Sequence, residues 1–502
     1  MTAGEARQVR ARVALVWFRQ DLRLADHRPL TEALARADSV FAVYVHDERA
    51  AGRWAPGGAG LWWLHHSLAA LGQSLREAGG RLVLRRGDAA TIIPELARQA
   101  GATEVHCGLA HEPWLRALDT EVADTLTHDG VGLHAHRVST LFDLDRIRTK
   151  TGGVYGVYTP FANTCRNLPP PPAPLPVPKC IPAAEGDWQS DRLEDWGLLP
   201  TKPDWAGGMR STWQPGEAGA HARVARFLAD HLDGYHESRD APADEDGTSM
   251  LSPHLHWGEI SATQVWHAAL DASAEGSRGT GFERFQGELL WHEFAAYLLW
   301  NRPSMPEQPL RPAFARLRWR QDPDAMRAWQ RGQTGVPIVD AGMRQLWQIG
   351  WMHNRVRMIT ASLLVKHLLV SWQDGEAWFW DTLVDGDLAT NAASWQWVAG
   401  CGTDAQPFFR IFNPVTQSRK FDPDGVYIRR WVPEVAKLPD RFLHAPWEAP
   451  PAELARAGIT LGKTYPMPVI ALDEGRDRAL AAFRQVRAEA REEALEAVPD
   501  AS

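Results

Sequence analysis

The segment from Asp385 to Trp397 reads DGDLATNAASWQW and places two carboxylates, an amide and two indoles close together. Carboxylates and amides can bind the polar edge of a planar cofactor, and indoles can stack on rings or pass an electron. The chain holds 24 Trp, which favours such a use of aromatic rings. The alternative is that the indoles fill a large helical core, since aromatic side chains bury much apolar area.

Residues 247–253 combine hydroxyl groups with a predicted helix start. Ser252 can cap this helix, and Pro253 suits its first position. Free N–H groups and the hydroxyls of Thr248 and Ser249 would then form a seat for an anion such as a pyrophosphate. An ordinary capped helix explains the same residues, so both interpretations stay open.

A second motif predicts one half-polar face of a helix, which is unusual for a core stripe. This face would contain Trp351, Asn354, Arg355 and Met358. Arg357 lies off the face and can pair with a carboxylate such as Asp385. A salt bridge that merely closes a helical core is the alternative.

Glu288 and Trp291 lie three residues apart on a predicted helix from Phe285 to Trp300. An acid beside an indole in this apolar sequence could donate a hydrogen bond. A single Glu on a helix is more often solvated, so this pair alone does not define a site.

Short apolar runs that alternate with helical patterns predict how these residues are positioned. The runs Val13–Phe18, Val40–Val45 and Arg81–Leu84 indicate a doubly wound parallel sheet. We expect an α/β domain over 12–140, a proline-rich interdomain linker over 141–220 and an all-helical domain over 221–495. One helix is predicted to start at Ser261, the first residue of a capping box. Two further helices are predicted over 355–370 and 471–497.

Composition limits the class of protein. With 44% hydrophobic and 23% charged residues, the 502-residue chain is typical of a globular protein of roughly two to four domains. The sequence shows no membrane span or signal peptide, and its four scattered cysteines predict a cytoplasmic protein without disulfides. No metal site is expected. The net charge of −8 still allows a local basic groove for nucleic acid.

Several motifs together make the chain similar to the photolyase/cryptochrome family over residues 13–490, and most similar to bacterial photolyases that act on cyclobutane pyrimidine dimers. The motifs are WFRQDLR (17–23), GGAGLWWLH (57–65), GTSMLSPHL (247–255), TGVPIVDAGMRQL (334–346), GWMHNR (350–355), DGDLATNAASWQW (385–397) and FRIFNP (409–414). The resemblance implies an α/β antenna domain and a helical domain that binds FAD and DNA.

The resemblance also implies roles for individual residues. The cofactor would be bound by Tyr235, Thr248, Ser249, Leu251, Ser252, Asn354, Arg357, Asp385, Asp387 and Asn391, with Asn391 facing flavin N5. Trp395, Trp372 and Trp319 match a relay that photoreduces the flavin. The dimer and its DNA would contact Arg239, Glu288, Trp291, Asn354, Arg355, Met358, Trp397 and Arg410. His292 and Phe285 depart from the family, where Arg and Trp are common.

The activity implied is light-driven repair of cyclobutane pyrimidine dimers by electron transfer from excited reduced FAD, performed by a monomer. A cryptochrome-type blue-light photoreceptor is the alternative. An antenna chromophore is expected, with folate (methenyltetrahydrofolate) favoured over deazaflavin. Glu112 is the candidate residue that would bind the pterin ring of this folate. In the competing interpretation Trp62 and Trp63 belong to the core and Glu112 is solvated.

Overall fold

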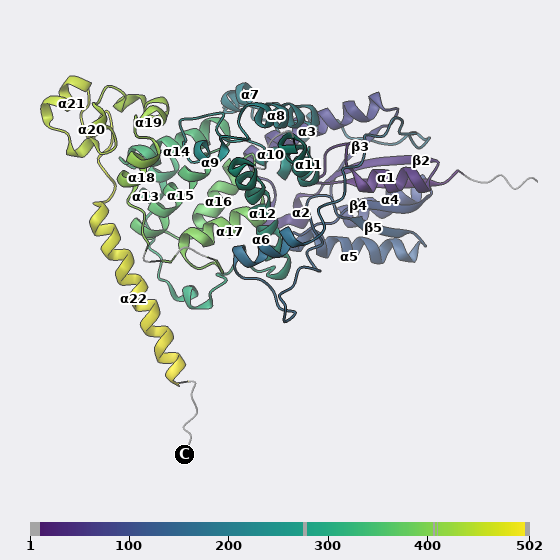
Figure 1. The fold of residues 1–502 in the computed structure, drawn as a ribbon. Coiled ribbons are helices and arrows are strands. Elements are labelled where there is room, and N and C mark those ends of the chain that lie inside the picture. Colours follow the sequence, from purple (N-terminus) through teal and green to yellow (C-terminus); the bar gives the residue numbers. More distant parts are fainter. Residues whose placement is uncertain (1–10, 275–278, 405–406, 409, 497–502) are drawn as a thin grey trace, which may run out of the picture.

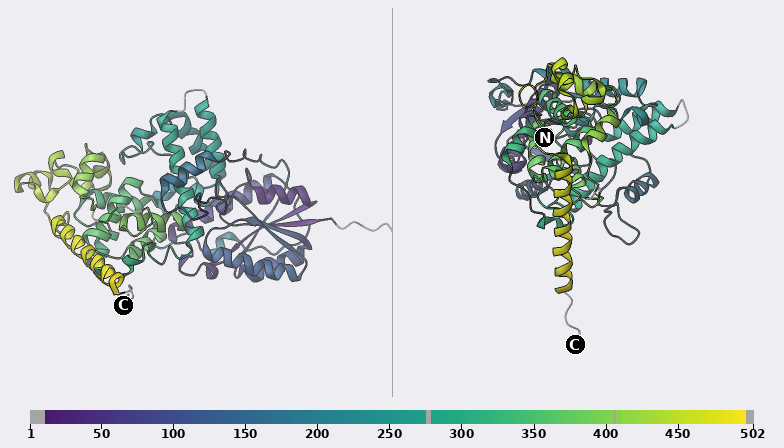
Figure 2. Two further views of the ribbon diagram at one scale, coloured as in Figure 1. Left: turned by 60° about the horizontal axis from the view of Figure 1, so that its bottom comes forward. Right: turned by 90° about the vertical axis from the view of Figure 1, so that its left-hand side faces the viewer.

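The N-terminal part of the protein is a five-stranded parallel sheet between two layers of helices (Figure 1 and Figure 2, left). The structure, a computed structural model, describes residues 11–274, 279–404, 407–408 and 410–496. The strand order is β3-β2-β1-β4-β5. The strands are β1 (Val13–Phe18), β2 (Ser39–His46), β3 (Leu82–Arg86), β4 (Ala102–Gly108) and β5 (Gly132–His136). The predicted doubly wound sheet is therefore confirmed.

Each face of the sheet is covered because successive side chains of a strand point to opposite sides. In β1, Val16 and Phe18 join an apolar cluster with α1 (Arg28–Arg36) and α3 (Gly58–Glu77). Leu15 and Trp17 instead join a cluster with α4 (Ala89–Ala100) and α5 (Pro113–His128). Both faces of β1 are therefore buried, which explains its continuous apolar run.

Residues 141–220 cross from the sheet to the helical part and contain helices of their own. These are α6 (Tyr158–Asn167), α7 (Gly207–Thr212) and the start of α8 (Glu217–Asp230). Phe161 of α6 packs on Phe294 and Tyr297 of the helical part. The proline-rich stretch 168–178 has no helix or strand, as its lack of N–H donors predicts.

The C-terminal part is helical, and several of its longer helices contribute residues to the candidate site. The longer helices are α11 (Ala262–Ala274), α12 (Thr280–Asn301), α13 (Pro323–Gln330), α14 (Pro337–Ile349), α15 (Asn354–Ser362), α16 (Trp372–Thr382), α17 (Leu388–Ala399), α18 (Pro414–Phe421) and α22 (Leu472–Glu496). Shorter helices of this part are α9 (Tyr235–Ser238), α10 (Ser252–His256), α19 (Val426–Trp431), α20 (Asp440–Leu443) and α21 (Pro451–Ala457), whereas the short α2 (Glu48–Ala51) follows β2 in the N-terminal part.

The predicted helix boundaries hold in part. The capping box before α11 is confirmed, since the Ser261 N–H donates to Gln264 Oε1 and the Gln264 N–H donates to Ser261 Oγ, each at 2.9 Å. The single helix predicted over 355–370 is wrong at its end. After α15 the chain makes a π-helical turn, Leu363–His367, and Leu369 then takes a left-handed φ of 55° that ends the helix.

The last helix, α22, projects from the body of the molecule (Figure 1). Its Ala479 and Val486 are buried against Phe408 and Leu317. Ala497, the predicted end of this helix, and Phe409 of the FRIFNP motif lie outside the described residues. No helix in the described part of the chain combines the length and the apolar character needed to cross a membrane.

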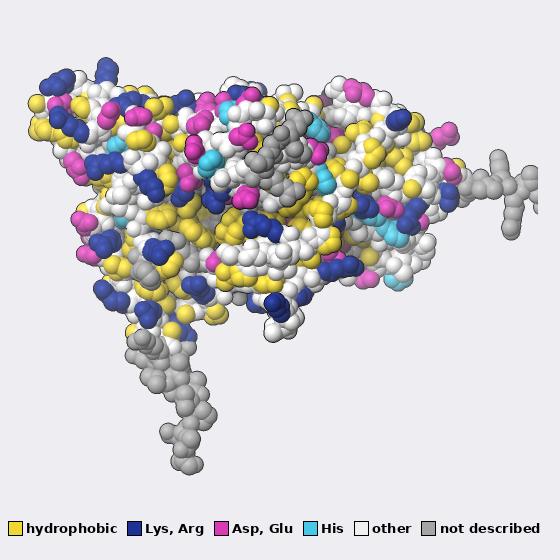
Figure 3. Space-filling model, viewed as in Figure 1, with side chains coloured by type: hydrophobic (Ala, Val, Ile, Leu, Met, Phe, Trp, Pro, Cys, Tyr) yellow, Lys and Arg dark blue, Asp and Glu magenta, His cyan; other side chains and the backbone are white. Residues whose placement is uncertain are grey.

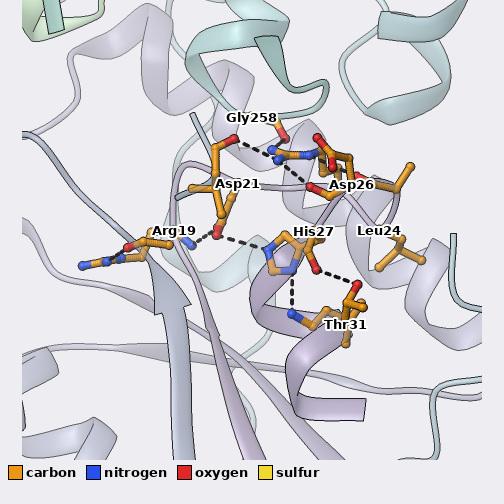
Figure 4. A network of polar contacts seen from close by, with 12 residues as sticks. Arg19, Asp21, Leu24, Asp26, His27, Thr31 and Gly258 are labelled. Atoms are coloured by element: carbon orange, nitrogen blue, oxygen red, sulfur yellow. Dashed lines mark hydrogen bonds and ion pairs between the residues drawn. The ribbon is translucent and has the colours of Figure 1, made fainter. Parts of the chain in front are cut away.

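The WFRQDLR motif forms a junction between the two parts (Figure 4). Buried Arg23 donates to the carbonyl oxygen of Gly258 at 2.9 Å and to that of Val138 at 2.9 Å. Asp21 lies 3.1 Å from His27 and accepts the Arg19 N–H at 2.7 Å. This motif therefore ties the sheet to the helical part.

Candidate active site

The helical part encloses a cavity of about 470 Å³, large enough for an organic cofactor. Thirteen of the predicted cofactor, substrate and relay residues line it, namely Arg239, Ser252, Glu288, Trp291, Asn354, Arg355, Arg357, Met358, Asp385, Asp387, Asn391, Trp395 and Trp397. In Figure 3, viewed as Figure 1, apolar and basic side chains lie side by side on the face around α12, α16 and α17.

The predicted ion pair between Arg357 and Asp385 is confirmed. The Arg357 Nη2 group lies 2.8 and 3.1 Å from the two Asp385 oxygens. Arg357 Nε also donates to the Met352 carbonyl oxygen at 2.7 Å, which fixes the guanidinium at the cavity wall. The Asp385 side chain is only 3% exposed, so solvent would screen little of its electrostatic interaction with a ring bound in the cavity.

Asn391 and Asp387 are oriented by the start of α17. Asp387 caps this helix by accepting the Thr390 N–H at 2.7 Å. One turn later, the buried Asn391 side chain donates through Nδ2 to the Glu376 carbonyl oxygen at 3.0 Å. This bond fixes the amide, and its carbonyl oxygen has no protein partner in the described part of the chain. A donor on a bound cofactor can therefore pair with it.

Glu288 does not lie in the apolar setting that the sequence suggested. The Arg239 guanidinium, from the end of α9, forms an ion pair with its carboxylate. Arg239 is buried, and its Nε lies 3.7 Å from Asp240 Oδ1 without a hydrogen-bond partner among the described residues. The prediction of an apolar environment is wrong because Arg239, distant in sequence, packs against this face of α12.

Trp351 does not share a helical face with Asn354, Arg355 and Met358, because α15 begins only at Asn354. It reaches the same cavity from the preceding loop, and its indole N–H donates to Ser252 Oγ at 3.2 Å. Arg355 lies 2.8 Å from Asp240, with its guanidinium over the ring of Phe421.

The predicted anion seat is organised differently from the expectation. The helix α10 begins at Ser252, and Leu251 precedes it without a side-chain cap. Met250 takes a left-handed φ of 48°, so the loop turns sharply after Ser249. Tyr235, Thr248, Ser249 and Leu251 are not among the residues that line the cavity. The hydroxyls of Thr248 and Ser249 have no hydrogen-bond partner within the described ranges.

The predicted relay indoles share one apolar cluster. Trp372 and Trp395 are buried in it, and the partly buried Trp319 packs against it. Helices α16 and α17 approach closely at Gly375, where a Cβ atom would lie 2.2 Å from the Trp395 ring. Trp395 also lines the cavity, so the cluster reaches the site through this residue. Trp329, which the sequence did not single out, stands edge-on to Trp395 at 6.2 Å.

Tyr158 is a site residue that the sequence analysis missed. It lies on α6, inside the predicted linker, and stacks on Trp291. Its N–H donates to Asp404, another lining residue that was not predicted. The three-residue spacing of Tyr158 and Phe161 would have indicated a helix face in this segment.

Buried imidazoles surround Asp387 on the side of the α/β part. Burial by itself would raise the pKa of Asp387, but His111 and His256 hold this pKa well below its usual range. Burial opposes the charging of His111, yet Glu112 and Asp387 raise the pKa of His111 to about 9. Glu112 is buried rather than solvated, while Trp62 and Trp63 lie in the core beside the sheet.

Arg410 lies on the exposed surface outside the cavity lining. Its backbone oxygen accepts a bond from the buried Lys366 amine at 3.3 Å. Its side chain makes no ion pair within the described ranges. Phe285 is buried and packs on Tyr235 and Phe227, whereas His292 lies between the large cavity and a smaller one near His111.

Comparisons with known proteins agree with this geometry. Residues 14–179 match the family model "DNA photolyase", and residues 285–485 match "FAD binding domain of DNA photolyase". The chain is 49% identical to a deoxyribodipyrimidine photo-lyase of Agrobacterium fabrum, over 94% of this chain and 98% of that protein. It is 34% identical to cryptochrome-1 of Arabidopsis thaliana, over 94% of this chain and 70% of that protein.

A solved structure shows the same fold. The crystal structure of a bacterial class III photolyase from Agrobacterium tumefaciens superposes with a TM-score of 0.92 at 47% identity. The match covers 97% of this chain and all (100%) of that one. By sequence and by fold, the chain belongs to the photolyase/cryptochrome family.

Proposed function

We propose that the protein is a deoxyribodipyrimidine photo-lyase that uses FAD and light to repair cyclobutane pyrimidine dimers in DNA. The observation that carries the proposal is the composition of one cavity. Its buried wall holds the buried Asp385 and Asn391 with the partly buried Arg357, and its partly exposed wall holds Trp291 and Trp397. The first set suits a flavin, and the second suits flat bases.

The buried wall would bind the cofactor. Arg357 and Asp385 would flank the ring, Asp387 would accept from its polar edge, and the fixed Asn391 oxygen would face N5. Asn354 and Ser252 line the same cavity, and Tyr235, Thr248, Ser249 and Leu251 would hold the pyrophosphate from the adjoining loop. In its reduced state FAD would supply the light-driven electron that splits the dimer.

The partly exposed wall would receive the lesion. Photolyases are among the enzymes that take the target out of the DNA stack, at a cost of a few kcal/mol that is lower for a damaged pair. Trp291 and Trp397 would stack on the dimer, Met358 would contact it, and Glu288 would pair with its polar edge. Arg239 holds the Glu288 carboxylate in place for this contact.

Two further proposals concern electrons and light. Trp395, Trp372 and Trp319 would reduce oxidised flavin from the surface. A folate antenna, favoured over deazaflavin, would contact Glu112. The cavity beside Glu112 is only about 40 Å³. Folate binding there would therefore require this cavity to widen, and mass spectrometry of released chromophores would identify the antenna.

Repair is measured directly. The reduced protein is irradiated with blue light in the presence of an oligonucleotide that carries one thymine dimer, and restored thymines are counted by chromatography. We expect repair in light and none in darkness. Absence of repair by protein that holds reduced FAD would refute the proposal. Light-dependent flavin reduction without repair would instead favour a photoreceptor, the alternative suggested by the similarity to cryptochrome-1.

A further inference from the structure

A second, smaller group of polar side chains lies at the junction of the two parts. His111 and Glu112 come from the loop before α5, whereas Asp387 caps α17. One ligand atom from each of these three buried residues lies within 4.8 Å of the other two. His111 Nε2 is 3.9 Å from Glu112 Oε1 and 3.9 Å from Asp387 Oδ2.

His256 lies beside this group on the Asp387 side, but it is not one of the residues whose ligand atoms all lie close together. Its Nδ1 lies 3.9 Å from Asp387 Oδ2 and has no hydrogen-bond partner, although the residue is only 8% exposed. Separations of this size are too long for hydrogen bonds. Two ligands bound to one ion at about 2.0–2.2 Å lie at most about 4.4 Å apart, so the two 3.9 Å separations from His111 Nε2 are compatible with a shared ion.

The charges around this group also favour a positive partner, either a protonated His111 or a bound metal ion. Glu112 and Asp387 are two buried carboxylates, and burial of a charge is costly unless it is paired. Within the described ranges, only imidazoles lie at ion-pair distance from them. Arg19 lines the same small cavity, but its guanidinium pairs with Asp119 at 2.6 Å.

The cavity that these residues line measures about 40 Å³. This space holds an ion with a water molecule, whereas the folate proposed to contact Glu112 would fit only after the cavity had widened, so the ion and folate are alternative occupants. Mixed imidazole and carboxylate ligands suit divalent transition metals better than Mg²⁺ or Ca²⁺, which prefer oxygen alone.

We propose that His111 Nε2, a Glu112 oxygen and Asp387 Oδ2, with a water molecule as fourth ligand, form a Zn²⁺ site that links the two parts of the protein. His111 and Glu112 belong to the α/β part, while Asp387 belongs to the helical part. A bound ion therefore stabilises the assembled molecule over one whose parts have separated. The ligands are far apart in sequence, which is why their spacing predicted no metal. This inference does not depend on the repair activity, and Asp387 would offer Oδ1 to the flavin while Oδ2 bound the ion.

The test measures zinc bound to full-length, tag-free protein. The protein is incubated with ZnCl₂, freed of loose ions and analysed by mass spectrometry for zinc per chain. We expect one ion per chain in the wild type, and zinc affinity about 100-fold weaker in His111→Ala and Glu112→Gln. Zinc should also raise the unfolding temperature of the wild type but not of these variants.

A matched control exists in a second histidine cluster. His136 lies 2.9 Å from His106 on the sheet, away from the junction. His136→Ala should bind zinc as the wild type does, and its loss of zinc would overturn the proposal. Equal zinc content in the wild type and in His111→Ala would also overturn the proposal. Zinc would then bind elsewhere, and a protonated imidazole would be the only cation of this group. Should His111→Ala fail to fold, Glu112→Gln decides, because it preserves side-chain volume and the bond to the His111 N–H.

Discussion

The ring of Trp291 lies flat against the ring of Tyr158, with centroids 3.6 Å apart and planes 5° from parallel. The Tyr158 hydroxyl donates to the Gly287 carbonyl oxygen at 2.7 Å, and its N–H donates to Asp404 at 2.9 Å. A residue outside the helical core thus supports one face of Trp291, and Trp291 itself lines the cavity. Tyr158 therefore positions the ring on which we expect the lesion to stack.

Tyr158→Ala should weaken binding of dimer-containing DNA by up to about tenfold, because an aromatic pair contributes roughly 0.5–1.5 kcal/mol. Tyr158→Phe keeps the ring and should bind within about twofold of the wild type, since only the bond to Gly287 is lost. Fluorescence anisotropy with a labelled oligonucleotide measures both. Wild-type affinity in the Ala variant would show that Trp291 needs no support.

Arg410→Ala should reduce the slope of log affinity for DNA against log salt by about one unit, because one phosphate contact is lost. Its side chain is exposed and has no ion-pair partner among the described residues. Arg355→Ala should change the slope less, since Arg355 already pairs with Asp240 at 2.8 Å. Titrations at several salt concentrations give the slopes. An unchanged slope in the Arg410 variant would place this side chain away from the phosphates.

Trp372→Phe should abolish photoreduction of the oxidised protein, because a phenyl ring is much harder to oxidise than an indole. The chemically reduced variant should repair dimers at nearly the normal rate, since the repair electron comes from flavin. Flavin absorbance under blue light follows the first reaction. The control variant is Trp188→Phe, because Trp188 lies against Phe41 of the sheet. This variant should photoreduce normally. Loss of repair in the reduced Trp372 variant would mean that this indole is structural.

Lys366 is a buried amine whose stability contribution should depend on pH. Its Nζ donates to the carbonyl oxygens of Phe408 at 3.2 Å and Arg410 at 3.3 Å, with Cys401 and His367 as its titratable neighbours. Burial lowers the pKa of Lys366 from 10.5 to about 7. Between these values the unfolded chain holds a proton that the folded chain lacks. The contribution of Lys366 therefore rises with pH, by at most about 1.4 kcal/mol per pH unit.

The comparison with Lys366→Met isolates this effect. The unfolding free energy of the variant, relative to the wild type, should be highest near pH 7 and fall toward pH 10. Urea unfolding at several pH values measures the difference, in which all other titrating groups cancel. Parallel stability curves for the two proteins would contradict the prediction.

Local spacing predicted much of the site correctly. The motif at 385–397 and the spacing of Asn354, Arg355 and Met358 identified several residues of the cavity wall, because the helical period places such residues on one face. The apolar runs identified three strands of the sheet, whereas β4 and β5 carry His and Glu within short strands. No side-chain pattern in the sequence predicted the left-handed backbone conformation of Leu369, which follows the π-helical turn.

By itself, the sequence determined the family, the two-part architecture and several residues of the cavity wall, because these depend on contiguous motifs and on periodicity. Only the tertiary structure decided which distant residues meet there. Tyr158 on Trp291, Arg239 on Glu288 and His111 beside Asp387 all join separate elements. Such contacts follow from how elements pack across the whole chain, and no local pattern encodes that packing.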